Sequence, residues 1–213
     1  MPYALTAVDD LTRPDHYFLS ADDECHFILE YTAGQGYQYS STNQFVFNFK
    51  KTMDQRGRFG WHYKGEAIQK AARLLAEVLN PKWLERATLV PIPPSKSKDD
   101  PLYDDRMTQV LRLVSEQIGG DLKELIVVRD SSVAVHTTVS RSSPDQLEQN
   151  YQLVGKLADY PAQCRVGVFD DILTTGAHFR AVKNTILRKY PEAEIVGIFL
   201  ARRVFANGAG GAY

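Results

Sequence analysis

Cysteine is scarce in this chain, with two residues, Cys25 and Cys164, among 213. Two thiols exclude a cysteine-based zinc site, and they also exclude a framework of several disulfides. Low cysteine use is typical of proteins from a reducing compartment, so we expect a cytoplasmic protein.

Long apolar runs and an excess of either charge are also missing. No apolar stretch approaches the roughly 18 residues that a membrane helix requires, and the N-terminus shows no signal-peptide pattern. The formal net charge is −1, from 25 Lys and Arg against 26 Asp and Glu. We therefore expect no membrane association and no strong electrostatic attraction to nucleic acid.

The N-terminal 60 residues differ in pattern from the rest of the chain. Residues 25–31 (CHFILEY) and 43–49 (NQFVFNF) are aromatic and β-branched, which predicts two strands with turn residues between them. We expect residues 1–60 to form a small antiparallel β-rich subdomain. At the other end, the Gly/Ala-rich residues 207–213 predict a disordered tail.

Between residues 61 and 206, short apolar runs alternate with segments of helical periodicity. Strands are predicted at 87–92, 125–128, 164–169 and 194–201, and helices over 65–79, over 107–118 and from 176 onward. This alternation predicts an α/β domain in which helices flank a parallel sheet. Ligands of such sheets bind at the carboxyl ends of the strands.

Residues 166–176 (VGVFDDILTTG) carry the strongest chemical signal of the chain. An apolar strand is followed by Asp170 and Asp171, a short apolar step, a hydroxyl and glycine turn, and a helix. Such a turn presents backbone N–H groups to an anion, and Gly176 permits close approach of the backbone. Two carboxylates would repel a bare anion, so the ligand should also offer hydroxyl groups or a magnesium ion. A simple helix cap is the alternative, but a cap needs one polar residue rather than five in fixed order.

This stretch resembles the phosphoribosyl-pyrophosphate (PRPP) motif of the type I phosphoribosyltransferase (PRTase) family. The resemblance implies that Asp170 and Asp171 are catalytic residues that face the ribose hydroxyls. It also implies magnesium, bound through PRPP and not ligated directly by the protein. The residues that would wrap the 5′-phosphate are Ile172, Leu173, Thr174, Thr175, Gly176 and Ala177.

A second segment with phosphate-binding chemistry follows the strand predicted at 87–92. Its hydroxyl and ammonium groups suit a pyrophosphate, although Ser/Lys loops are also common on protein surfaces. The prediction gains support because this loop and the PRPP motif should lie at the same edge of the sheet. The residues of this expected pyrophosphate loop are Ser95, Lys96, Ser97 and Lys98.

Two further polar segments bear on the site. Residues 129–149 lack apolar periodicity over an unusual length, so we expect a flexible lid in which His136 and Arg141 are the residues to test. Residues 50–58 contain four basic side chains, which could contact a phosphate, although a solvated basic face is the commoner explanation.

The resemblance extends loosely over residues 60–201 to the ComF-type branch of the family. Residues 90–93 (VPIP), followed by a basic loop and a helix, agree with that branch, as does the Lys64–Gly65 step before the first helix. The chain departs from it in having no cysteine-rich zinc module. Residues 98–105 (KDDPLYDD) are also acidic where the branch is basic, so the acceptor specificity does not carry over.

The resemblance implies a PRPP-binding transferase that moves a phosphoribosyl group between pyrophosphate and a base or amine acceptor. The expected ligand is PRPP or a nucleoside monophosphate, in a protein that acts alone, as a homodimer or with a protein partner. The alternative is a non-catalytic PRPP- or nucleotide-sensing module that acts with partner proteins. A nucleic-acid-binding role would need a basic, aromatic-lined stripe, which we do not identify in the sequence.

Overall fold

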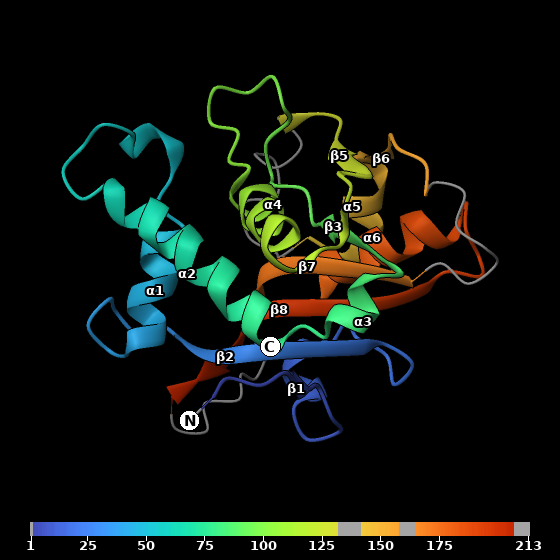
Figure 1. The fold of residues 1–213 in the computed structure, drawn as a ribbon, viewed down its shortest axis with the longest axis horizontal. Coiled ribbons are helices and arrows are strands. Elements are labelled where there is room, and N and C mark those ends of the chain that lie inside the picture. The colour runs from blue at the N-terminus through green and yellow to red at the C-terminus, as the bar shows by residue number, and fades with distance from the viewer. Residues whose placement is uncertain (1, 132–141, 158–164, 207–213) are drawn as a thin grey trace.

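The computed structural model describes residues 2–131, 142–157 and 165–206 and shows an α/β fold (Figure 1). A six-stranded mixed sheet has the strand order β1-β2-β8-β7-β3-β4. Only β1 pairs in the antiparallel sense, and the other neighbours are parallel. The strands are β1 (Thr6–Ala7), β2 (Glu24–Ala33), β3 (Ala87–Pro91), β4 (Asp121–Leu122), β7 (Arg165–Leu173) and β8 (Glu194–Phe205).

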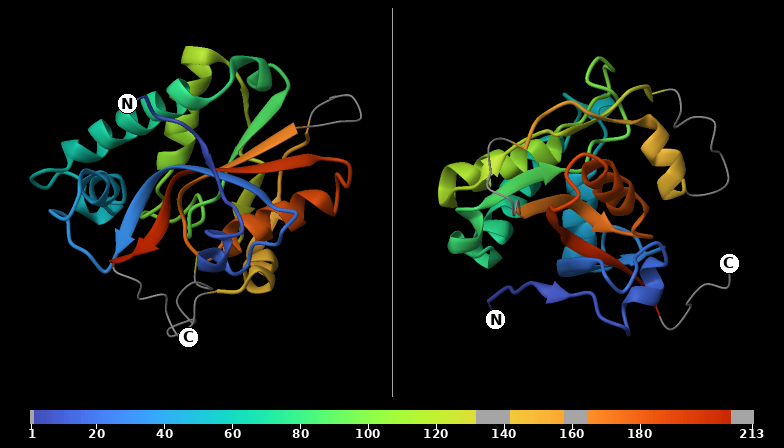
Figure 2. Two further views of the ribbon diagram at one scale, coloured as in Figure 1. Left: turned by 90° about the horizontal axis from the view of Figure 1, so that it is seen from below. Right: turned by 90° about the vertical axis from the view of Figure 1, so that its right-hand side faces the viewer.

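Helices cover both faces of this sheet (Figure 2). On one face, α1 (Ser41–Phe49), α2 (His62–Val78) and α4 (Arg106–Ile118) share a core with Leu89 and Phe169. On the other face, α6 (Ala177–Leu187) packs its apolar side on alternate residues of β7. The other helices of the described residues are short: α3 (Pro81–Leu84), α5 (Pro144–Asn150) and the 3-10 helices η1 (Arg13–His16) and η2 (Met53–Gln55). The predicted sheet of mostly parallel strands between helices is confirmed.

Strand β7 is longer than the sequence indicated. We expected it to end at Phe169, but it continues through the acidic pair to Leu173. The cause is pairing with β8, in which Ile172 lies opposite Ala201 and Leu173 opposite Arg202. The two carboxylates therefore stand on a paired strand, which fixes their backbone more firmly than a loop would.

The prediction of a strand at residues 43–49 is wrong, because this segment is helix α1. Ser40 caps the helix by accepting a hydrogen bond from the backbone N–H of Asn43. Phe45, Val46 and Phe49 are buried, as expected for one face of a helix. The expected antiparallel unit is not formed either, since β2 pairs in parallel with β8 of the main sheet.

The strand expected at 125–128 exists as β5 (Ile126–Val128), but it does not belong to the parallel sheet. It pairs antiparallel with β6 (Tyr151–Leu153) in a separate two-stranded sheet. The short strand β4 occupies the position beside β3 instead. Residues 207–213, expected to be a disordered tail, lie outside the described residues.

No helix in the described part of the chain is long and apolar enough to cross a membrane.

Candidate functional site

A pocket of about 400 Å³ lies at the carboxyl edge of the sheet. Its walls come from the segment after β3 (residues 92–95), the start of α4 (residues 104–108), the end of β7 and the first turn of α6, together with Lys50 and Thr52. Asp170, Asp171 and Ser95 therefore line one cavity. The PRPP-motif segment and Ser95 of the expected pyrophosphate loop, which the sequence assigned to the same sheet edge, therefore meet in this pocket.

Asp171 is buried and is held by two cations of the protein. Its Oδ2 accepts hydrogen bonds from Arg106 Nη2 at 2.6 Å and Nε at 3.1 Å, and its Oδ1 lies 3.2 Å from Lys50 Nζ. Burial by itself would raise the pKa of this carboxyl group, but the charges of Lys50 and Arg106 outweigh burial and lower it. Asp171 is therefore an ionised, ion-paired group.

Asp170 has the opposite character. It is half-buried, and no Lys or Arg of the described residues forms an ion pair with its carboxylate, whose Oδ1 accepts the N–H of Asp171 at 2.8 Å. Burial, followed by the adjacent charge of Asp171, raises the pKa of Asp170 to about 7. This carboxyl group can exchange a proton near neutral pH and can accept a hydrogen bond from a ligand in the pocket.

Arg106 belongs to a buried ionic network that joins three helices. Its Nη1 lies 2.6 Å from Asp104 Oδ2, which also pairs with Lys64 Nζ at 2.8 Å. Lys64 is 4% exposed, and its ammonium also donates to the carbonyl oxygens of Phe49 and Lys51, at 3.0 and 2.8 Å. The network anchors the end of α1 and the chain that follows it, and so places Lys50 beside the acidic pair.

In the turn from Thr174 to Gly176, the backbone carbonyl groups accept hydrogen bonds from other residues, whereas the backbone N–H groups have no acceptor among the described residues. His16 Nδ1 bonds to the carbonyl of Thr174, and the N–H of Phe18 donates to the carbonyl of Thr175 at 2.9 Å. The backbone N–H groups of Thr174, Thr175 and Gly176 form no hydrogen bond within the described part of the protein. Three consecutive donors before a helix N-terminus make an anion-binding geometry.

Glycine is required at position 176 for two reasons. Its φ of 86° lies in the left-handed region, and a Cβ atom there would lie 2.7 Å from Leu19 Cδ2. Leu19 follows the segment that occupies the carbonyl groups of the turn. Residues 16–19 therefore support the turn from one side and leave its donors free on the other.

His178, on the first turn of α6, is a pocket residue that sequence reasoning missed. Its Nδ1 lies 2.7 Å from the hydroxyl of Tyr151, and it lines both the main pocket and a smaller cavity against the turn. Its side chain is exposed, and desolvation by the surrounding protein lowers the pKa of the ring. The only sequence signal was its place two residues after Gly176.

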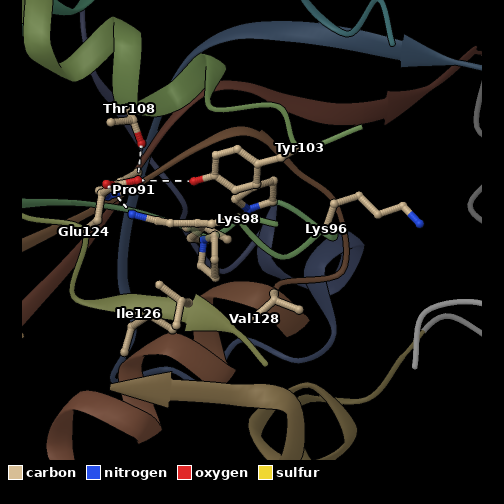
Figure 3. A pocket seen from close by; sticks show the side chains of 12 residues that line it. Pro91, Lys96, Lys98, Tyr103, Thr108, Glu124, Ile126 and Val128 are labelled. Atoms are coloured by element: carbon tan, nitrogen blue, oxygen red, sulfur yellow. Dashed lines mark hydrogen bonds and ion pairs between the residues drawn. The ribbon is translucent and has the colours of Figure 1, made fainter. Parts of the chain in front are cut away.

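The residues of the expected pyrophosphate loop do not face one common site in the structure. Ser95 lines the main pocket, but Lys98 pairs with Glu124 at 2.7 Å and Lys96 lies 3.6 Å from Asp100. Lys98 and Glu124 line a separate small cavity, and Figure 3 shows Lys98 directed at Glu124. The ammonium group of Lys96 points away from Glu124 in the same view. Ser97 bonds to Ser131.

Lys50 and Arg106 are the cations that stand beside the acidic pair. We expected Lys50 on a solvated basic face; its side chain is indeed exposed, but its ammonium also contacts Asp171. Arg106 was not singled out at all. The sequence placed it only at the start of a helix, where nothing local indicates a partner 65 residues away.

The predicted lid is described only in part. His136 and Arg141 lie outside the described residues. The end of the same stretch forms α5, where Ser143 and Gln146 make a capping box and Pro144 stands in the first turn. A helix start of the form Ser-Pro-x-Gln is a recognisable signal that the sequence reasoning overlooked.

No family model and no curated protein matches this chain.

Proposed function

We propose that the pocket binds PRPP and that the protein transfers a phosphoribosyl group between pyrophosphate and a base or amine acceptor. One observation carries the proposal. Asp170, a half-buried carboxylate that forms no ion pair with a Lys or Arg of the described residues, lines the same pocket as Thr174 at the carboxyl edge of β7. Thr174 begins the turn whose backbone N–H groups, through Gly176, have no hydrogen-bond partner within the described residues. A phosphate with hydroxyl groups attached complements both features, because the turn donates hydrogen bonds and the carboxylate accepts them.

The remaining pocket residues can be assigned to the two ends of such a ligand. The turn and the start of α6 would hold the 5′-phosphate, and Asp170 would accept hydrogen bonds from the ribose hydroxyls. Arg106 and Lys50, rather than Lys96 and Lys98, are close enough to the acidic pair to meet the pyrophosphate. Their present partner, Asp171, keeps them in place before the ligand arrives.

In this proposal, magnesium enters the site as part of the ligand. Within the described residues, no group of three or more His, Cys, Asp or Glu side chains is placed to hold a metal ion. Asp170 offers carboxylate oxygens, which magnesium prefers, but one carboxylate leaves most of its coordination to phosphates and water. When bound, magnesium would neutralise charge on the pyrophosphate.

In the proposed reaction, the bond between ribose C1 and a pyrophosphate oxygen breaks, and a bond between C1 and a nitrogen of the acceptor forms. The electron pair of the broken bond leaves with pyrophosphate. Positive charge develops on the ribose ring in between, and Asp170 stands where its ionised form would stabilise that charge. Holding the phosphate at the turn fixes C1 relative to the acceptor, which contributes through positioning.

A sensing module that binds PRPP or a nucleotide without turnover is the second candidate. The observation that favours it is the ion pairing of the cations: Lys96 and Lys98 are paired away from the pocket, and Lys50 and Arg106 are paired with Asp171. A leaving pyrophosphate would have to compete with these carboxylates for its cations.

Thermal unfolding with PRPP and magnesium tests PRPP binding, which both candidate functions require. A ligand at a hundredfold excess over its dissociation constant should add about 2.7 kcal/mol to the free energy of unfolding. Absence of any shift at millimolar PRPP would contradict both. Pyrophosphate release in the presence of a panel of bases and amines then separates the transferase from the sensor, which should release none.

A further inference from the structure

A second pocket, of about 530 Å³, lies on the far side of Lys50, between the end of β2, helix α1 and the start of α2. Five of the side chains that line it are aromatic: Tyr31, Tyr37, Phe47, Phe59 and Tyr63. Four of the five are exposed, and the ring of Phe59 is fully open to solvent. We call this cavity the aromatic pocket. Aromatic rings gathered around a concave surface form an uncommon arrangement unless a ligand or partner covers them.

The charge of the aromatic pocket is of one sign. Lys50 and Lys51 line it, and no Asp or Glu of the described residues does. Lys51 Nζ lies 5.1 Å from the centre of the Tyr63 ring and donates to Asn48 Oδ1 at 2.7 Å and to the carbonyl of Gly60 at 2.9 Å. An ammonium group has three N–H donors, so one of those on Lys51 remains for a ligand.

Two of the aromatic rings that line the pocket pack against each other. Tyr37 and Phe47 lie edge to face, with 6.3 Å between their centres. Phe47 lies on α1, and Tyr37 lies in the turn before it, where its hydroxyl accepts a hydrogen bond from Gln44 at 2.9 Å. A flat ring inserted beside them would gain stacking contacts that a saturated ring of the same size would not.

We propose that the aromatic pocket binds a small planar aromatic anion, with its ring against the aromatic side chains and its acidic group toward Lys51 and Lys50. The volume suits a compound of one or two fused rings with one acidic substituent. Both an aromatic carboxylic acid and a nucleotide have this chemistry. The inference stands on this pocket alone and does not depend on the proposed function.

Calorimetric titration with 2-naphthoate, a planar aromatic carboxylate, tests the proposal. We expect 2-naphthoate to bind and cyclohexanecarboxylate, which has the same charge but no flat ring, to bind at least tenfold more weakly. Phe47→Ala and Lys51→Met should each weaken 2-naphthoate binding about tenfold. The matched controls, Tyr3→Ala and Lys82→Met, change exposed residues outside the pocket and should leave binding unchanged.

Titration with adenosine monophosphate distinguishes the two sources of the ligand. If Phe47→Ala weakens the binding of adenosine monophosphate, the ligand of the aromatic pocket is a nucleotide. If Phe47→Ala weakens the binding of 2-naphthoate but leaves that of adenosine monophosphate unchanged, the ligand is a small aromatic acid. Melting temperatures of the variants show that each remains folded.

Three results would overturn the inference. These are equal binding of the flat and the saturated acid, no binding of either at millimolar concentration, and binding that survives both Phe47→Ala and Lys51→Met. Sedimentation velocity tests whether a second copy of the chain occupies the aromatic pocket. A wild-type dimer that Phe47→Ala dissociates would assign the pocket to that copy instead of a small ligand.

Discussion

Asp170 and Asp171 are neighbours of the same residue type, yet the structure shifts their pKa values in opposite directions. Burial acts on both carboxyl groups in the same sense. The difference comes from the cations, because Lys50 and Arg106 bind Asp171 directly and act on Asp170 only from a distance. Asp171 therefore organises the pocket, whereas Asp170 is the carboxylate available to a ligand.

Asp170→Asn should stabilise the protein at alkaline pH. The folded protein retains the Asp170 proton up to about pH 7, whereas the unfolded chain releases it near pH 4. The stability contributed by Asp170 is thus fully present below about pH 4 and is lost as the pH rises toward 7. Thermal unfolding should show little difference from wild type at pH 4 and a higher melting temperature for the variant at pH 8. Asp99→Asn, which changes an exposed carboxylate, should behave like wild type at both pH values.

Lys64→Met should destabilise the fold by about 3 kcal/mol or more, the usual effect of breaking a buried ion pair. The change leaves the carbonyl groups of Phe49 and Lys51 without their donor and removes one of two cations from Asp104. Urea unfolding measures the loss, and Arg73→Met, on the exposed side of the same helix, serves as its control. A loss below 1 kcal/mol would show that water replaces the ammonium and that the network does not anchor α1.

At the scale of elements, local patterns predicted most of the fold, and the failures have identifiable causes. The helices α2, α4 and α6 and the strands β3 and β8 have strong apolar periodicity and lie where it indicated. Residues 43–49 failed because Phe45, Phe47 and Phe49 alternate as in a strand, whereas the Ser40 cap and burial of Val46 favour the helix. Tertiary packing therefore overrode the alternating aromatic pattern on which the strand prediction rested.

Gly176→Ala should disrupt the turn from Thr174 to Gly176 more than it disrupts the rest of the fold. A non-glycine residue with this φ costs about 1–2 kcal/mol, and the added methyl group also meets Leu19. We expect a lower melting temperature together with loss of the stabilisation by PRPP and magnesium. Gly36→Ala, where an added Cβ meets nothing within 4 Å, is the matched control. Retained stabilisation by PRPP in Gly176→Ala would show that the turn does not hold the phosphate.

At the scale of the whole molecule, the missed parts of the site other than His178 are those joined across long distances in the chain. Lys50 and Asp171 are 121 residues apart, and Lys64 and Asp104 are 40 apart. No periodicity or motif encodes such pairs, because each partner looks locally like an ordinary surface charge. By contrast, Asp170 to Gly176 could be recognised because the whole group lies in one short segment.

The N-terminal segment before β2 is the longest-range part of the site. His16 is fully buried and bonds to Thr174, which is 158 residues away, and the neighbouring Phe18 bonds to Thr175. Burial lowers the pKa of His16, so the ring is neutral at pH 7, and its Nδ1–H donates to the carbonyl oxygen. A segment in which sequence analysis identified no site residue thereby supports the turn from Thr174 to Gly176.

His16→Ala should therefore weaken binding of ribose 5-phosphate, by up to about tenfold, which corresponds to the loss of one hydrogen bond. The turn would lose the donor to Thr174, and its open N–H groups would no longer converge on one point. Calorimetry on His16→Ala and on Asp10→Ala, an exposed change in the same segment, measures the effect. His16→Gln retains a side-chain N–H and should recover part of the affinity. Equal affinities in all three variants would show that the N-terminal segment only covers the turn, and that β7 and α6 alone set its shape.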